Sequence, residues 1–367
     1  MGDAKTNLKN SNDYYKFIIE RKYLIITLFV IVLFILFTGG FGLVKSIDKN
    51  SNTPEEKICG DGTLYNNCSL AKPYFCSEGK LIELVSACGC PEDFIIENNF
   101  CASSYQTEPK EISLKYTLRG EEHYIPFVVY GGFANYVYDI PRSIRYSSGE
   151  NSSRADFKLK AINEEEQRKF LMPLVIKIQN ITNDKEDQAR IAISIVQNIP
   201  FGASNKTSTF GNYKINYSRY PYDVLYDMQG ICGEKTDLLT FILKEMGYGT
   251  AFFYYPSYNH ESLGIKCPVK ESLIESEYCF VETTGPSILT DDMMSYVGMG
   301  KLYSYPEFYF VSDGIALGED IYEYSDADRL IRIRERIEEG KQINAFSNKA
   351  YEELFKKYGL TKEYYGG

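Results

Sequence analysis

The chain contains only two histidines, His123 and His260, among its 367 residues, and it contains no tryptophan. Imidazole is the usual general base and a common metal ligand, so few positions can fill either role. No histidine accompanies the cysteines that cluster in the N-terminal third, which favours disulfides over a zinc site there. A D-x-D-x-D-G calcium loop is also missing. The sequence gives no reason to expect a metal ion.

Basic residues are outnumbered, because 40 Lys and Arg stand against 50 Asp and Glu, which gives a formal net charge of −10. Binding to nucleic acid requires clustered positive charge that neutralises phosphates, and no basic patch stands out after the first 44 residues. We therefore expect no nucleic-acid partner, and we interpret the acidity as a solubility feature.

Residues 24–44 form an apolar run without any ionisable side chain. At about 1.5 Å per residue in a helix, this run can cross a hydrocarbon core of about 30 Å. Residues 1–23 carry more Lys and Arg than the residues after the run, which predicts a cytoplasmic N-terminus and an extracytoplasmic remainder. The alternative, a cleaved signal peptide, is less favoured because the run is long and lacks a small-x-small cleavage site.

Six cysteines follow a polar stalk at residues 45–57 and define a module at residues 58–103. This span is too small and polar to bury a core of its own, so we expect disulfides to hold it together in an oxidising compartment. Fifteen connectivities are possible, and the sequence does not choose among them. The six are Cys59, Cys68, Cys76, Cys88, Cys90 and Cys101.

The rest of the chain predicts an α+β fold. Residues 110–160 form a β-rich extension with strands at 112–116 and 124–130, where apolar and polar residues alternate. In a catalytic domain at residues 161–325, we expect Asn163 and Asp184 to begin helices. Residues 201–222 read as irregular, and strands are predicted at 250–255, 260–266 and 278–283. Residues 326–367 predict two helices, whose arginine-rich stretch we interpret as a solvated face without a partner.

Cys232 is the most informative residue. It lies in QGICGEK, at the start of an amphipathic helix whose apolar stripe includes Leu238 and Ile242 and which ends at Gly247. The first turn of a helix offers free backbone N–H groups and partial positive charge, which favour a thiolate and can bind an oxyanion. We therefore expect Cys232 to act as a nucleophile.

Acyl chemistry with a thiol also requires a base and a group that orients it. His260 and Glu282 supply both on consecutive predicted strands, with β-carbons about 5 Å apart if the two residues are directly opposite. Glu261 and Glu277 are alternative acids, but Glu261 points away from His260. His123 lacks a thiol or acid partner. Gln229 and Tyr226 remain open as donors that complete an oxyanion hole beside the Cys232 N–H.

Residues 220–286 resemble the transglutaminase-like superfamily, particularly its membrane-anchored archaeal members. The motifs are QGICGEKTDLLTFILKEMGYG, NHESLGIKC and YCFVETTGP. The resemblance implies a papain-like cysteine fold in which Cys232, His260 and Glu282 are nucleophile, base and orienting acid. Animal transglutaminases place tryptophans around their acyl site, so this chain is not expected to crosslink glutamine to lysine in that way. The superfamily more often has Asp at the position of Glu282.

A Cys267–Cys279 disulfide would leave Cys232 as the odd thiol among nine cysteines. A regular ladder with His260 opposite Glu282, however, separates these two cysteines by about 13 Å, too far for a disulfide. Either the chain folds back near Pro268 or one of the two assignments is wrong.

Two functions fit the sequence. The first is a membrane-anchored, extracytoplasmic cysteine enzyme that acts on peptide or protein amides through a thioester, as a peptidase, amidase or transamidase. This enzyme would need no cofactor, because the Cys232 thiol itself supplies the nucleophile for the reaction. The second is a cell-surface binding or structural module of the same fold without turnover, with the tyrosine-rich region 213–226 as a recognition surface.

Overall fold

The computed structural model describes residues 57–144, 146, 153–210, 213–296 and 299–361. The expected cytoplasmic segment and membrane helix, and all of the stalk except Lys57, lie outside the described residues. Among the helices that are described, none is both long and apolar enough to span a bilayer.

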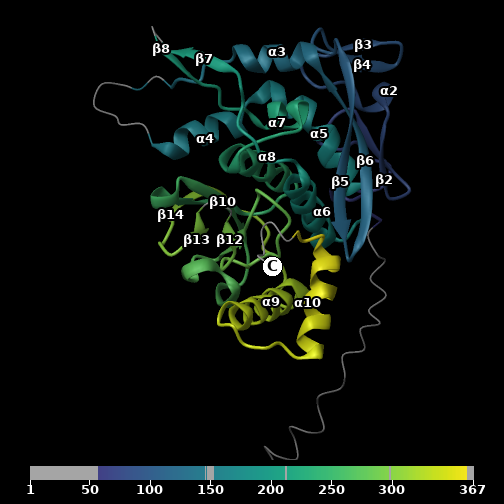
Figure 1. Cartoon of the computed structure of the whole chain (residues 1–367). Coiled ribbons are helices and arrows are strands. Elements are labelled where there is room, and N and C mark those ends of the chain that lie inside the picture. Colours follow the sequence, from purple (N-terminus) through teal and green to yellow (C-terminus); the bar gives the residue numbers. More distant parts are fainter. Residues whose placement is uncertain (1–56, 145, 147–152, 211–212, 297–298, 362–367) are drawn as a thin grey trace, which may run out of the picture. The chain divides into compact units, whose positions relative to one another are not determined.

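The described elements carry the labels of Figure 1. The helices are α2 (Val85–Cys88), α3 (Gly131–Asp139), α4 (Arg154–Ile162), α5 (Glu165–Gln179), α6 (Lys185–Asn198), α7 (Pro221–Asp227), α8 (Cys232–Glu245), α9 (Tyr322–Glu338) and α10 (Ala345–Tyr358). The strands are β1 (Tyr74–Ser77), β2 (Lys80–Glu83), β3 (Ile95–Glu97), β4 (Phe100–Ala102), β5 (Pro109–Leu118), β6 (Glu121–Tyr130), β7 (Thr207–Phe210), β8 (Tyr213–Asn216), β9 (Thr250–Tyr255), β10 (His260–Lys266), β11 (Tyr278–Val281), β12 (Ser295–Tyr296), β13 (Gly300–Lys301) and β14 (Glu307–Ser312).

The cysteine-rich module is held by disulfides, as predicted. The bridges are Cys59–Cys76, Cys68–Cys88 and Cys90–Cys101. The module contains two short hairpins, β1–β2 and β3–β4, and the single turn of α2. Each bridge joins one of these elements, β1, α2 or β4, to an irregular segment of the module. Three crosslinks within so short a span limit the unfolded chain, which compensates for the small apolar core.

The module packs against the helical part of the chain rather than extending from it. The side-chain amide of Asn180, after α5, both donates to the Leu81 carbonyl and accepts from the Leu81 N–H, each at 2.9 Å. The Gly60 carbonyl accepts from Lys185 and from buried Gln188, at 2.9 and 3.0 Å. These bonds join the module to α5 and α6, so the two parts form one packed unit.

The β5–β6 hairpin contains both strands predicted near residues 112–130 and is longer than expected. Its two-residue turn places Arg119 at φ 52° and Gly120 at φ 86°, the left-handed conformation that matches the twist of a tight hairpin. The Thr117 N–H donates to Ser194 Oγ at 2.8 Å, which connects the end of β5 to α6.

Helix α8 lies at the centre of the part of the chain that carries the predicted site, between the sheet and other helices (Figure 1). One side faces β9 and β10, and the other packs against α6 and α7. Leu238, Leu239 and Ile242 are buried, and Gly247 at φ 92° ends the helix as predicted. The antiparallel sheet has the order β11–β10–β9–β14. The chain therefore combines helices with small antiparallel sheets, in agreement with the expected α+β class.

The register of β10 and β11 differs from the prediction by two residues. Leu263 lies opposite Val281, so Glu282 falls at the level of Ser262 and is a diagonal neighbour of His260. Side chains two residues apart on one face of a pair of strands remain within contact distance. The same shift brings Cys267 and Cys279 together diagonally, with their Cα atoms 5.7 Å apart in a disulfide. The conflict between disulfide and triad arose from assuming that the two triad residues were directly opposite.

Three other local predictions were wrong. Asn163 does not begin a helix: it is the C-cap of α4, and α5 starts two residues later. Helix α4 itself was not predicted, although Ser153 and Asp156 form a reciprocal capping box at its start. The region 201–222, expected to be irregular, contains the β7–β8 hairpin.

The two C-terminal helices are confirmed as α9 and α10, but the arginine stretch is not uniformly solvated. Arg334 is buried and forms two hydrogen bonds to Asp291, at 2.6 and 2.5 Å. A paired guanidinium and carboxylate can be buried because each neutralises the other. The pair fastens α9 to the loop that follows Glu282.

Candidate active site

The start of α8 is fixed by a buried ion pair. Glu234, in the first turn, accepts a hydrogen bond from the Ile231 N–H at 3.0 Å. Buried Arg219 donates to Glu234 twice, from its backbone N–H at 2.8 Å and from its guanidinium at 3.1 Å. Because this pair holds the residue before the helix, it defines where Cys232, the first residue of α8, is presented.

Cys232 is the free thiol of the chain. The other eight of the nine cysteines form four disulfides, and all nine lie within the described residues. Cys232 is half-buried. Its thiol is therefore free to react, whereas the other eight cysteines are held in disulfides.

The three residues singled out by the sequence meet at one point. His260, the first residue of β10, forms a hydrogen bond through Nε2 with Glu282 Oε2 at 2.9 Å. The side chain of Cys232 lies close enough to His260 to raise the pKa of the imidazole. Because Glu282 engages Nε2, the ring nitrogen left for the thiol is Nδ1. The order thiol, imidazole, carboxylate is the arrangement that nucleophilic cysteine catalysis requires.

Glu282 is fully buried and is held by five hydrogen bonds. Its Oε1 accepts from the Thr283 N–H, the Thr284 N–H and the Thr284 hydroxyl, at 2.9, 2.7 and 2.6 Å. Its Oε2 faces His260. Glu282 follows the last residue of β11, where the strand ends and the turn can direct backbone N–H groups back at the carboxylate.

Tyr296 is a member of the site that sequence reasoning missed. Its hydroxyl donates to Glu282 Oε2 at 2.6 Å, and its ring centroid lies 4.7 Å from that of His260. Tyr296 is buried and comes from the short strand β12, far along the chain. No motif or spacing in the sequence distinguishes it from the other 31 tyrosines.

The charges of His260 and Glu282 stabilise each other. Burial lowers the pKa of His260, but the negative charge of Glu282, which accepts a hydrogen bond from the imidazole, and the nearby side chain of Cys232 outweigh it and raise the pKa to about 10. Burial likewise acts to raise the pKa of Glu282, but His260 and the hydroxyls of Thr284 and Tyr296 hold it at about 2. At neutral pH the pair is an imidazolium and a carboxylate.

Two threonines attach α8 to the strand end that carries Glu282. Thr283 Oγ1 donates to the Cys232 carbonyl at 3.4 Å and lies 3.1 Å from Thr236 Oγ1. Both threonines are buried. Short polar side chains thus connect α8 to the segment that carries the Glu282 carboxylate. The sequence offered only the weak signal that a threonine follows the acidic residue.

No protein-family model, curated protein or solved structure matches this chain.

The alternative candidates lie elsewhere. Glu261 points away from His260, as predicted, and pairs with Arg154 and Lys158 at 2.9 and 2.6 Å. His123 is on β6, where its ring stacks on Tyr116. Glu277 precedes β11, and its backbone carbonyl accepts a hydrogen bond from the Cys267 N–H. The two alternative carboxylates and the second histidine are therefore not part of the triad.

The two candidates for a second oxyanion donor differ in position. Tyr226 lies against the β-hairpin side, where Lys110 Nζ donates to its carbonyl at 2.7 Å. Gln229, three residues before Cys232, has its side-chain oxygen 3.4 Å from the guanidinium of Arg219. A side chain at position 202 would clash with the Gln229 amide, because a Cβ built on Gly202 lies 1.9 Å from Gln229 Nε2. Glycine at this position therefore leaves room for the Gln229 side chain.

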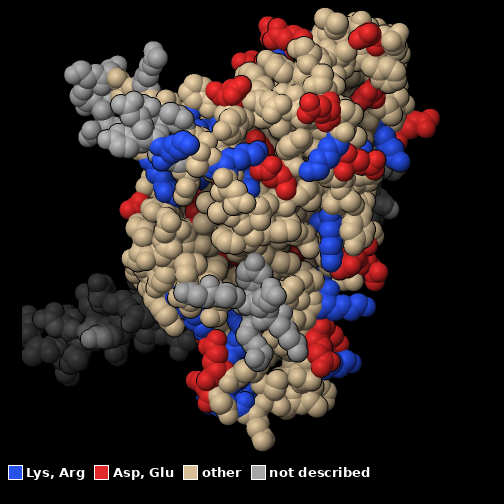
Figure 2. Space-filling model, turned by 45° about the horizontal axis from the view of Figure 1, so that its top comes forward, with Lys and Arg blue, Asp and Glu red and all other residues tan. Residues whose placement is uncertain are grey.

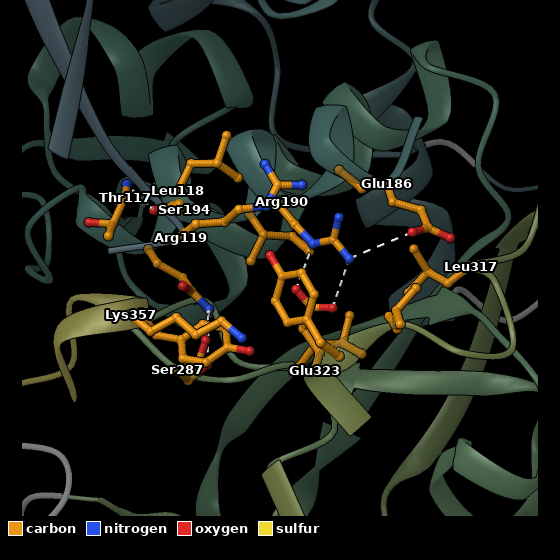
Figure 3. A pocket seen from close by; sticks show the side chains of 17 residues that line it. Thr117, Leu118, Arg119, Glu186, Arg190, Ser194, Ser287, Leu317, Glu323 and Lys357 are labelled. Atoms are coloured by element: carbon orange, nitrogen blue, oxygen red, sulfur yellow. Dashed lines mark hydrogen bonds and ion pairs between the residues drawn. The ribbon is translucent and has the colours of Figure 1, made fainter. Parts of the chain in front are cut away.

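A small cavity of about 50 Å³ lies beyond the triad, between α6, the end of β5 and the C-terminal helices (Figure 3). Its charged lining residues are paired: Arg190 with Glu323 at 2.6 Å, and Arg119 with Asp187 at 2.7 Å. None of the triad residues lines it. The cavity borders the site through Gln197, whose amide donates to the Glu282 carbonyl at 2.9 Å, but it is not where the thiol reacts.

The surface drawn in Figure 2 mixes both signs of charge with broad uncharged areas and shows no extended basic region. Within the described residues, no group of three or more His, Cys, Asp or Glu side chains is arranged to hold a metal ion.

Proposed function

We propose that the chain is a membrane-anchored, extracytoplasmic cysteine enzyme of the transglutaminase-like type, which acts on peptide or protein amides through a thioester. The observation that carries the proposal is that His260 hydrogen-bonds to the buried carboxylate of Glu282 and that the free thiol of Cys232 lies near enough to raise the pKa of the same imidazole. The motifs and their order along the chain support the same family.

The chemistry follows from the protonation states. With His260 as imidazolium, the adjacent thiol is favoured as a thiolate. The sulfur of Cys232 attacks the amide carbonyl carbon, and the C–O electron pair moves onto oxygen. When the oxyanion collapses, the C–N bond breaks, and His260 gives its proton to the departing amine. The products of this half-reaction are an acyl thioester and a free amine.

Neutral His260 then serves as the base for the second half-reaction. It takes a proton from water or from an amine, which attacks the thioester carbonyl and displaces the Cys232 sulfur. Water gives a carboxylic acid, as in a peptidase or amidase, and an amine gives a new amide, as in a transamidase. The Cys232 N–H at the α8 start is suited to bind the oxyanion in both steps.

Two features support the proposed location. Four disulfides are typical of proteins that fold in an oxidising compartment. The apolar run at residues 24–44, preceded by basic residues, supports a single membrane span with the catalytic part outside.

The test uses the full chain in detergent. Iodoacetamide at pH 6 should alkylate Cys232 at least ten times faster than N-acetylcysteine, as located by peptide mass spectrometry, and Cys232→Ala should abolish this labelling. In surface extracts, an acyl-electrophile probe should label the wild-type chain at Cys232 and should not label Cys232→Ala. His260→Ala should lose the rapid labelling, and His123→Ala is the matched control that keeps it.

The proposed enzymatic function would be refuted if Cys232 were labelled no faster than N-acetylcysteine, or if rapid labelling persisted in His260→Ala. The chain would then fit the alternative function, a binding or structural module of the same fold.

A further inference from the structure

Lys235 is a completely buried lysine one helical turn after Cys232 on α8. Its Nζ lies 2.6 Å from the Ile199 carbonyl, 3.0 Å from the Thr284 carbonyl and 3.4 Å from the Gln197 carbonyl. Within the described part of the chain, it makes no ion pair with a carboxylate. Three acceptors match the three N–H donors of an ammonium group, whereas a neutral amine has only two.

Two of these acceptors belong to the end of α6. The Gln197 carbonyl is one of the last four of that helix, which lack partners within the helix, and Ile199 is its C-cap residue. Carbonyl groups at a helix C-terminus carry partial negative charge and stabilise a cation. This explains how an ammonium group can be buried without a carboxylate in contact.

The third acceptor connects Lys235 to the triad. Thr284 donates two hydrogen bonds to Glu282, from its N–H and its hydroxyl, and its carbonyl is the one that Lys235 binds. The ammonium group therefore fixes the residue that fixes the catalytic carboxylate. Burial lowers the pKa of Lys235 to about 7, and the charges of Glu282 and Cys232 oppose this shift. The lysine thus lies within electrostatic range of both groups.

A count of charges shows what Lys235 adds. In the reactive form, thiolate Cys232 and carboxylate Glu282 are negative and imidazolium His260 is positive, which leaves one net negative charge in a buried site. An ammonium at Lys235 brings the site to neutrality. Without it, thiolate formation would place a second negative charge near Glu282 with only His260 between them.

We propose that Lys235 is a positioning residue for the thiol, whose buried ammonium both holds Thr284 against Glu282 and balances the charge of the thiolate. This inference rests on the proposed function, because it assigns Lys235 a role in the reactivity of Cys232. A purely structural role, as a cap of α6, would require the hydrogen bonds but not the charge.

The test is the pH profile of Cys232 alkylation by iodoacetamide in the full chain. Lys235→Met keeps the unbranched chain and removes the charge. We expect its profile to move to higher pH by about one unit, which lowers the rate near pH 6 about tenfold, while the plateau at high pH stays unchanged. Lys244→Met, on the same helix, is the matched control, because Lys244 donates to Asn163 near the other end of α8.

A second measurement needs no variant. In wild type with ¹³C-labelled lysine, the side-chain carbon signal that titrates near pH 7 reports Lys235. Carboxamidomethylation of Cys232 removes the thiolate, so this midpoint should fall. If the Lys235→Met profile coincides with wild type, or if alkylation leaves the lysine midpoint unchanged, the inference is overturned. Slow alkylation of wild type itself would instead refute the proposed function.

Discussion

Replacing Glu282 with glutamine removes the negative charge beside His260 but keeps the size of the side chain. The remaining amide oxygen can still accept from the Thr283 and Thr284 N–H groups. The new amide nitrogen, however, faces His260 Nε2 and can only donate to it. The imidazole is then forced to be neutral with its proton on Nδ1, toward the thiol, which is the wrong tautomer for a base.

The size of the effect follows from the two pKa shifts. The shift of His260 from 6.5 to about 10 corresponds to about 5 kcal/mol, and that of Glu282 from 4.5 to about 2 corresponds to about 3 kcal/mol. We adopt the smaller value, because the His260 shift also contains the contribution of Cys232. Glu282→Gln should therefore lower the His260 pKa by at least about 2 units.

The scarcity of histidine makes the assay simple. An NMR titration of imidazole Cε1–H signals shows two resonances in this chain, and His123 serves as the internal reference. The raised pKa of His260 means that its contribution to folding is complete below pH 6.5 and is lost as the pH rises through about 10. The free energy of unfolding of wild type should fall over this range, and that of Glu282→Gln should fall much less.

The matched control is Glu261→Gln, since Glu261 is also buried and adjacent to His260 in sequence but pairs with Arg154 and Lys158 on the other face. This variant should leave the His260 midpoint in place. If His260 titrates at the same pH in wild type and in Glu282→Gln, the electrostatic account of the triad is wrong.

Three further predictions concern stability. Tyr296→Phe removes a hydrogen bond to the charged carboxylate of Glu282 and should lower the free energy of unfolding by about 2 kcal/mol in urea titrations; no change would show that the hydroxyl is dispensable. Arg334→Met leaves its buried carboxylate partner without a counter-charge and should cost about 3–5 kcal/mol, whereas exposed Arg332→Met should cost less than about 1. Replacing both cysteines of the Cys267–Cys279 bridge with serine should cost about 3 kcal/mol, and equal urea midpoints would contradict this.

The sequence predicted the elements of the site better than their register. The ends of β9 and β10 agree with the predicted strands, because β9 is rich in aromatic residues and Pro and Asn residues mark the turns that follow the strands. Helix α8 was clear from its apolar stripe and terminal glycine. Strand register, however, depends on how side chains of two distant segments pack, and a shift by two residues keeps every side chain on its predicted face. The pattern alone could not detect it.

Other parts of the site could not be found from the sequence for a related reason. Lys235 and Tyr296 reach the triad through tertiary contacts with α6 and Glu282, and neither residue has a local pattern that indicates burial. A lysine in the first turn of a helix is ordinarily exposed. Arg334 was misread in the same way, because its partner Asp291 is 43 residues away in the chain.

The diagonal pairing of β10 and β11 gives the Cys267–Cys279 crosslink a role at the opposite end of the ladder. If β11 slipped by one residue along β10, Glu282 would turn to the other face of the sheet and lose His260. The covalent bridge forbids that slip, because the same movement would pull its two cysteines onto opposite faces. Correct alignment of Glu282 with His260 is thereby coupled to oxidation of the Cys267 and Cys279 thiols during maturation, whereas Cys232 must stay reduced.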